Sequence, residues 1–202
     1  MTDLATIAER DDRPQEDHFV HLRDVTWADY QRLLEIRGDR SAPRITYLQG
    51  TLEIMTPSRH HESIKSIIGC LVEVWCLEHG VDFGTYGSWT LENEAEDRGA
   101  EPDECYVFGE VEEPDRPDLA IEVVWTSGGI NKLEVYRKLA VREVWYWRRG
   151  RIQPYVLRGE RYEAVERSEA LPELDLEQLA SFLDRRPTSR AIREYRASLR
   201  GE

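Results

Sequence analysis

One short segment constrains the fold more than any other: residues 119–124 read Leu-Ala-Ile-Glu-Val-Val. An apolar run of this length, broken only by one glutamate, is typical of a central strand that is covered on both faces. A strand of this kind needs helices packed above and below its sheet. The segment therefore predicts an α/β protein with helices on both faces of a sheet.

Hydrophobic spacing elsewhere supplies the remaining elements. The clearest helix begins at Pro57-Ser58 and ends near His79-Gly80, because apolar residues between them recur every three or four positions. Further helices are expected over 26–36, 131–139, 175–183 and 188–199. Strands are expected over 82–86, 104–108 and 162–165, with hairpins formed by 44–48 and 51–55 and by 143–147 and 152–157.

The chain has 202 residues, which is the size of one domain. Residues 1–20 lack periodicity, so we expect a disordered or loosely docked arm there and a single domain over 21–202. No apolar stretch is long enough for a spanning helix, and residues 1–17 do not resemble a signal peptide, so a cytoplasmic protein without membrane contact is expected. Three cysteines cannot all pair, and reduced thiols are expected.

The formal net charge is -13, which argues against a protein that binds phosphates over a broad surface. The acidic residues, however, are concentrated in residues 1–20 and 91–122. Residues 123–155 and 185–200 are basic. A local basic face is therefore compatible with the composition, although such charge runs are more often solvated faces without a ligand.

Two carboxylates are candidates for a metal site. Alternation places Glu122 on the apolar face of its strand, where an ionised carboxylate requires a cation as partner. Asp103 lies at the start of the preceding strand, so the two acids would converge if the strands are neighbours. Two carboxylates with water and phosphate oxygens suit magnesium or manganese. The alternatives are a core salt bridge from Glu122 to an arginine and a turn role for Asp103.

Lys132 and His61 are the further candidates. Lys132 begins a predicted helix on the side that carries Tyr136 and Leu139, so its ammonium is expected to turn toward the strand ends. A solvated lysine is the alternative. His61 lies on the inward face of the long helix, where a core or capping histidine is the alternative to a role in chemistry.

These residues together resemble the PD-(D/E)xK nuclease superfamily, and within it the Uma-two family of candidate restriction endonucleases. The resemblance covers about residues 26–183. It is carried by the segments 54–58 (Ile-Met-Thr-Pro-Ser) with His61, 101–103 (Glu-Pro-Asp), 117–124 (Pro-Asp-Leu-Ala-Ile-Glu-Val-Val), 132–139 (Lys-Leu-Glu-Val-Tyr-Arg-Lys-Leu) and 141–145 (Val-Arg-Glu-Val-Trp). The superfamily places its lysine two residues after the second acid, where this chain has Val124. The lysine role would therefore pass to Lys132.

The resemblance implies a restriction-endonuclease-like fold, which is a mixed central β-sheet flanked by helices. It also implies a magnesium- or manganese-dependent nuclease, in which Asp103, Glu122 and the carbonyl of Val123 bind the metal while Lys132 and His61 assist. The expected partner is nucleic acid, DNA in the first place, and a homodimer is a candidate assembly. The alternative is a catalytically silent nuclease fold that binds nucleic acid or protein. An unrelated hydrolase has little support, because the usual hydrolase and nucleotide-binding motifs are missing from the sequence.

Overall fold

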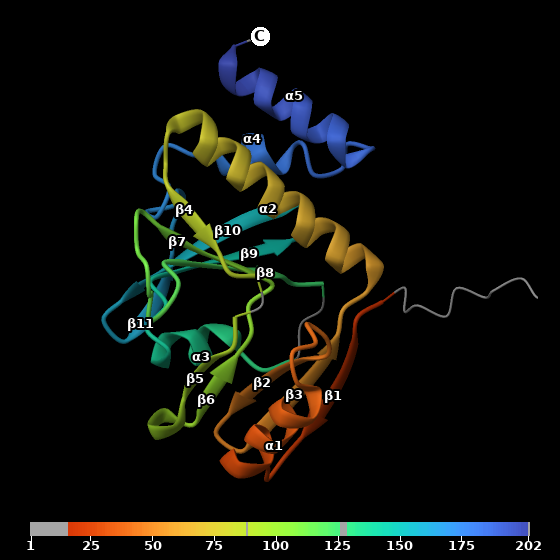
Figure 1. The fold of residues 1–202 in the computed structure, drawn as a ribbon, viewed down its shortest axis with the longest axis vertical. Coiled ribbons are helices and arrows are strands. Elements are labelled where there is room, and N and C mark those ends of the chain that lie inside the picture. The colour runs from red at the N-terminus through yellow and green to blue at the C-terminus, as the bar shows by residue number, and fades with distance from the viewer. Residues whose placement is uncertain (1–15, 88, 126–128, 202) are drawn as a thin grey trace, which may run out of the picture.

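The computed structural model describes residues 16–87, 89–125 and 129–201, which form two β-sheets with helices packed against them (Figure 1). The larger sheet is mixed: β8 and β9 are parallel, and the other neighbours are antiparallel. Its strands lie in the order β11 (Arg161–Ala164), β10 (Arg151–Arg158), β9 (Glu143–Arg148), β8 (Leu119–Val123), β7 (Glu104–Phe108) and β4 (Phe83–Thr85).

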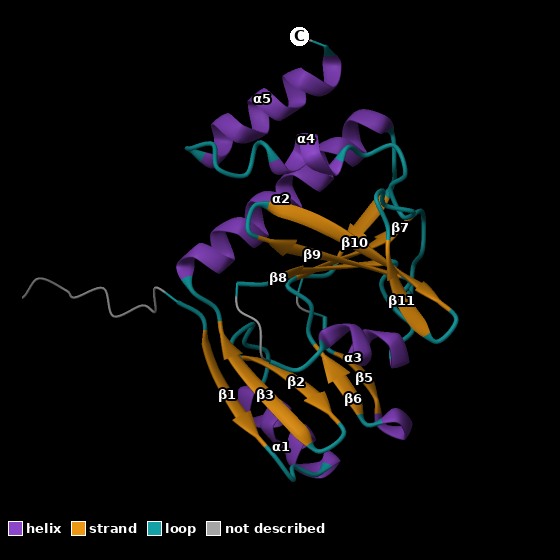
Figure 2. Ribbon diagram, turned by 180° about the vertical axis from the view of Figure 1, so that it is seen from behind, coloured by secondary structure: helices purple, strands orange, loops and turns teal. Residues whose placement is uncertain are grey.

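The smaller sheet is antiparallel and lies beside the C-terminal end of β8 (Figure 2). Its strands lie in the order β1 (His18–Leu22), β3 (Thr51–Thr56), β2 (Arg44–Leu48), β6 (Arg98–Ala100) and β5 (Leu91–Asn93). A short 3-10 turn, η1 (Glu94–Glu96), joins β5 to β6. Helix α1 (Trp27–Arg37) covers this sheet through a cluster that contains Tyr30, Tyr47 and Leu52.

Helices cover both faces of the larger sheet, as the apolar central strand requires. On one face lie α2 (Arg59–His79), α4 (Leu176–Ala180) and α5 (Thr188–Arg200), and their apolar side chains form the largest core cluster with β7, β8 and β9. On the other face, α3 (Lys132–Lys138) packs Val135 and Tyr136 over Ala120 and Val144. The predicted α/β class and mixed central sheet with flanking helices are therefore confirmed.

Helix α2 illustrates how the sequence determines these elements. The hydroxyl of Ser58 accepts a hydrogen bond from the backbone N–H of His61 at 3.1 Å and so caps the first turn. The inward side chains Ile64, Ile68 and Leu71 are essentially buried. Each buried side chain of this size contributes about 1.5–3 kcal/mol, so the apolar stripe holds α2 against the larger sheet.

The structure corrects the prediction for the N-terminal arm. Residues 1–15 lie outside the described residues, but His18–Leu22 forms β1 and pairs with β3 along its whole length, from His18 opposite Thr56 to Leu22 opposite Leu52. Strands β5 and β6 were also not predicted, because the acidic residues around them hide the alternation of such short segments. The other predicted helices and strands are present, with ends that differ by a few residues.

No helix among the described residues is both long enough and apolar enough to span a membrane. The three cysteines are free thiols, as expected. Burial raises the pKa of both Cys76 and Cys105 to about 12, so neither thiol ionises at neutral pH.

Candidate active site

A cleft of about 380 Å³ lies between the two sheets. One wall comes from β1 and β3, and the other comes from the end of β8, from β9 and from the start of α3. The side chains that line it include two acids, Glu53 and Glu122, together with Lys132. We refer to it below as the intersheet cleft.

Glu122 lies at the base of this cleft with only 2% of its surface exposed. The ammonium of Lys132 is 2.6 Å from its Oε2, and the hydroxyl of Tyr136 donates to its Oε1. Burial, and then the charge of Glu122, raise the pKa of Tyr136 well above its ordinary value, so the phenol stays protonated and remains a donor. The inward orientation expected for Lys132 is therefore present, and its partner is Glu122.

Asp103 is fully buried and immediately precedes β7. Its Oδ2 accepts a hydrogen bond from the backbone N–H of Val123 at 2.6 Å and lies 2.9 Å from Nε2 of His61. A guanidinium nitrogen of Arg44 bonds its Oδ1. Strands β7 and β8 are neighbours, as the metal hypothesis requires. The hydrogen bond to Val123 therefore places Asp103 beside the residue that follows Glu122.

His61 connects Asp103 to the N-terminal segment. Its Nδ1 lies 2.9 Å from Oδ2 of Asp17, whose Oδ1 accepts the backbone N–H of Ser58 at 2.7 Å. Burial alone would raise the pKa of Asp17, but the hydrogen bonds from His61 and Ser58 outweigh it and hold the pKa below its ordinary value. Asp17 is therefore an ionised partner that orients the imidazole.

The structure thus brings the four predicted residues together as two pairs, Asp103 with His61 and Glu122 with Lys132. Each of the two carboxylates is bound by partners of its own, so the prediction that they share one cation stays a prediction. An arginine does take part in a buried ion pair, but it is Arg44 and it binds Asp103 rather than Glu122.

Sequence reasoning did not find four residues around these pairs: Asp17, Arg44, Glu53 and Tyr136. Tyr136 was detectable, since it follows Lys132 by one helical turn. Asp17 gave no usable signal because it lies in an acidic segment without periodicity. Glu53 and Arg44 are strand residues whose partners come from distant parts of the chain.

Glu53 joins the two walls of the intersheet cleft. Its Oε2 accepts the backbone N–H of Ile130, in the segment leading into α3, at 3.0 Å, and lies 2.8 Å from Nε2 of His21. Gly129 approaches so closely that a Cβ there would lie 2.2 Å from the same oxygen. The segment that carries Lys132 is therefore held against the smaller sheet through Glu53.

Residues 27–185 match the model of the family Uma2, described as "Putative restriction endonuclease". The chain belongs to the Uma2 family. The family resemblance inferred from the sequence is therefore confirmed, and with it a restriction-endonuclease-like fold and a nuclease family. A search of the curated proteins found no match.

A solved structure is also similar to this Uma2 chain. It is described as a "putative nuclease belonging to DUF820" from Anabaena variabilis. The two chains are 14% identical, the match covers 74% of this chain and 96% of that one, and the TM-score is 0.49.

Nucleases of the restriction-endonuclease type generally use divalent metal ions, and the donors in this Uma2 chain fit such an ion in kind. Glu122 and Val123 line the cleft, and Asp103 lies behind them, so the available ligands are oxygens. Among the described residues, no three His, Cys, Asp or Glu side chains gather closely enough to hold an ion by themselves. Water and phosphate oxygens would have to complete the coordination, as is usual for magnesium.

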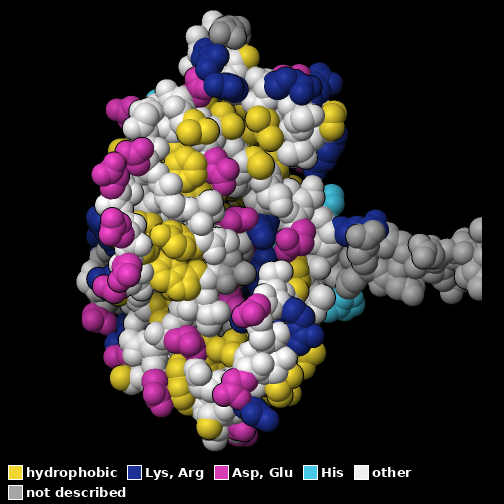
Figure 3. Space-filling model, viewed as in Figure 1, with side chains coloured by type: hydrophobic (Ala, Val, Ile, Leu, Met, Phe, Trp, Pro, Cys, Tyr) yellow, Lys and Arg dark blue, Asp and Glu magenta, His cyan; other side chains and the backbone are white. Residues whose placement is uncertain are grey.

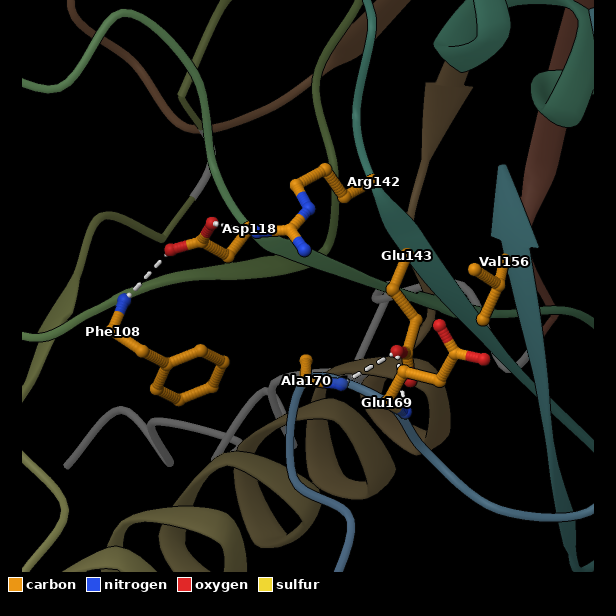
Figure 4. Close-up of a pocket in the computed structure, with 7 residues that line it drawn as sticks. All are labelled: Phe108, Asp118, Arg142, Glu143, Val156, Glu169 and Ala170. Carbon is orange, nitrogen blue, oxygen red and sulfur yellow. Dashed lines mark hydrogen bonds and ion pairs between the residues drawn. The ribbon is translucent and has the colours of Figure 1, made fainter. Parts of the chain in front are cut away.

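A second cavity, of about 220 Å³, lies where β8 and β9 begin, at the end of these strands opposite the intersheet cleft; Figure 4 shows the residues that line it. Its buried acid, Glu143, accepts the backbone N–H groups of Glu169 and Ala170 at 2.8 Å and the indole N–H of Trp145 at 2.5 Å. These three N–H donors satisfy the hydrogen-bonding needs of the Glu143 carboxylate without a ligand. Glu143 therefore anchors the segment before α4 to β9, and the cavity is not a candidate active site.

Proposed function

We propose that this protein is a metal-dependent nuclease that hydrolyses phosphodiester bonds of nucleic acid, DNA in the first place. The observation that carries the proposal is the pair of Glu122 and Lys132, 2.6 Å apart at the base of the intersheet cleft. Phosphodiester hydrolysis needs an oriented water and a positive charge close to the reacting phosphate. An acid and an ammonium in one cleft provide the groups for both tasks.

Each residue has a distinct task in this proposal. Asp103, Glu122 and the carbonyl of Val123 would hold a magnesium or manganese ion, which when bound supplies positive charge and lowers the pKa of a coordinated water. Lys132 places its ammonium where negative charge develops on the phosphate oxygens. His61 fixes the orientation of Asp103, and Tyr136 does the same for Glu122.

Cleavage of end-labelled single-stranded and duplex oligonucleotides, with magnesium, manganese or EDTA, tests the proposal. We expect cleavage only with metal. Glu122→Gln and Lys132→Ala should each lower the rate by at least about 100-fold, which is the usual effect of losing such a group. Glu134→Gln and Lys138→Ala, on the exposed part of α3, are the matched controls and should cut like the wild type. Equal cleavage rates in the wild type and all four variants would refute the assignment of Glu122 and Lys132 to the active site.

One observation favours the second candidate, a catalytically silent fold that binds nucleic acid or protein. Asp103 is fully buried and already paired with Arg44, so its oxygens are less available to a metal. Calorimetric titration with manganese separates the two candidates. Binding that is lost in Glu122→Gln supports the nuclease, whereas nucleic-acid binding without any manganese binding supports the silent fold.

The proposal also includes a cytoplasmic homodimer, the assembly that would bring two intersheet clefts to one substrate. Sedimentation velocity with and without oligonucleotide tests the assembly. A monomer under both conditions would remove the dimer from the proposal and leave the chemistry unaffected.

A further inference from the structure

We infer that the intersheet cleft takes an unpaired nucleotide strand rather than an intact duplex. The inference rests on the proposed function and deepens it by naming the substrate class. It follows from the depth of the site, from the aromatic rings beside it and from the position of the unpaired positive charge.

The acid at the base of the cleft is difficult for a duplex to reach. Glu122 is only 2% exposed, and Glu53 holds the segment before Lys132 against the opposite sheet. The volume of about 380 Å³ lies in the range of sites that enclose one small organic molecule, which is the scale of a nucleotide. The bases of a duplex stay inside its stack, so an unpaired strand can bring a nucleotide into a site of this size more readily than a duplex can.

Two aromatic rings on the lining of this cleft are partly exposed. Phe19 in β1 is 37% exposed, and Trp125, just after β8, is 38% exposed. Trp125 is held between His60, with ring centroids 5.3 Å apart, and Trp147, at 4.8 Å. A ring that is fixed by its neighbours yet still exposed presents a prepared flat surface. Bases of an unpaired strand stack on such surfaces, with about 1–3 kcal/mol per base.

Arginines without an ion-pair partner also adjoin this cleft. Arg148 lines it, and Arg149 and Arg151 follow in the β9–β10 turn; all three are exposed, and within the described residues none of their side chains has an ion-pair partner. The other basic group lies over α5, at the top of Figure 3. There, Arg185 and Arg190 bind Glu194, and Arg196 and Arg200 bind Glu78.

Exposed stacking rings next to unpaired arginines are the combination that recognises single-stranded nucleic acid. A duplex keeps its bases stacked on one another, so it would use the arginines but gain nothing from Phe19 or Trp125. The rings therefore distinguish the two substrate classes.

The test compares one fluorescein-labelled oligonucleotide as a single strand and as a blunt duplex, by anisotropy in EDTA and in magnesium, at several salt concentrations. We expect the full-length protein to bind the single strand at least about tenfold more tightly. Trp125→Ala should weaken single-strand binding by about 5- to 150-fold, and Trp125→Phe should restore most of it. Leu77→Ala is the matched control, because Leu77 is an apolar side chain, 70% exposed on α2, that does not line the cleft.

Cleavage assays on the same oligonucleotides separate this inference from the proposed function. Duplex binding that equals or exceeds single-strand binding, with an unaffected Trp125→Ala variant, overturns the inference even if the protein cuts duplex. Selective single-strand binding that depends on Trp125, without cleavage in any metal, overturns the nuclease and supports the inferred ligand. Binding of neither form overturns the inference as well.

Discussion

Replacing Arg44 by methionine tests how the buried charges of the candidate site are balanced. Arg44→Met keeps the apolar stem of the side chain and removes the guanidinium that bonds the fully buried Asp103. The same guanidinium lies 3.0 Å from Glu62, whose side chain is 42% exposed. The substitution therefore removes one buried ion pair, one surface ion pair and a buried contact with His61 at 3.2 Å.

The expected loss of stability follows from these surroundings. Leaving one partner of a buried ion pair unpaired costs about 3–5 kcal/mol, and a surface pair contributes at most about 1 kcal/mol. In Arg44→Met, Asp103 keeps its hydrogen bond from the N–H of Val123 at 2.6 Å and its contact with His61 at 2.9 Å. The expected loss of stability is therefore near the lower limit of this range of about 3–5 kcal/mol. We expect about 3 kcal/mol, or a fall in melting temperature of about 6–12 °C for a chain of this length.

Guanidinium denaturation in EDTA measures this loss, and the double variant Arg44→Met/Asp103→Asn identifies its cause. Without the unpaired charge, the double variant should be more stable than the sum of the single effects predicts, by about 2 kcal/mol. Arg32→Met, which removes an exposed pair with Glu35, is the control and should change stability by less than about 1 kcal/mol. Manganese should stabilise Arg44→Met more than the wild type, since a bound cation replaces the lost charge.

Two results would contradict this account of the site. One is a loss below about 1 kcal/mol in Arg44→Met, which would mean that Asp103 is not held as an ionised group. The other is strict additivity in the double variant, which would mean that Arg44 stabilises the fold through packing alone.

Two further predictions concern the residues around these pairs. The pKa of Asp17 is lowered in the folded state, so its ionised form stabilises the fold above the unfolded pKa of about 4, and this contribution is lost as pH falls. Asp17→Asn should therefore be less stable than the wild type at pH 7. Its melting temperature should also decline less steeply than that of the wild type between about pH 5 and 3. Gly129→Ala should displace Glu53 and with it the segment before Lys132. The cleavage rate should fall by more than about tenfold, with little change in melting temperature. Cleavage at the wild-type rate would show that Glu53 does not position this segment.

The larger sheet and its helices were predictable because their signals are local. The apolar strand at 119–124, the helical spacing from Ile64 to Trp75 and the cap at Ser58 each depend on residues close in sequence. The smaller sheet was only partly predictable. Its hairpin, β2 with β3, has a local turn, but β1 is defined by its pairing with β3, thirty or more residues later.

The candidate site shows the same division. Glu122 in β8 and Lys132 at the start of α3 are separated by a single strand-to-helix connection. Spacing and helical periodicity were therefore enough to suggest that Lys132 turns toward the strand end. Arg44, Asp17 and Glu53 reach the site only through the tertiary fold, from positions whose local pattern is that of an ordinary strand or an acidic tail. Charge counting likewise identified two basic segments, but not that Arg190, Arg196 and Arg200 of α5 are already bound to glutamates.

The position of β1 has a practical consequence for anyone who produces this protein. Phe19 and His21 of β1 form part of the cleft lining, and Asp17 immediately before it holds His61. The last helix ends at the opposite extreme of the molecule, where the C-terminal label stands in Figure 1. A bulky fusion partner joined close to residue 16 would therefore stand beside the site, whereas one joined beyond α5 would be remote from it.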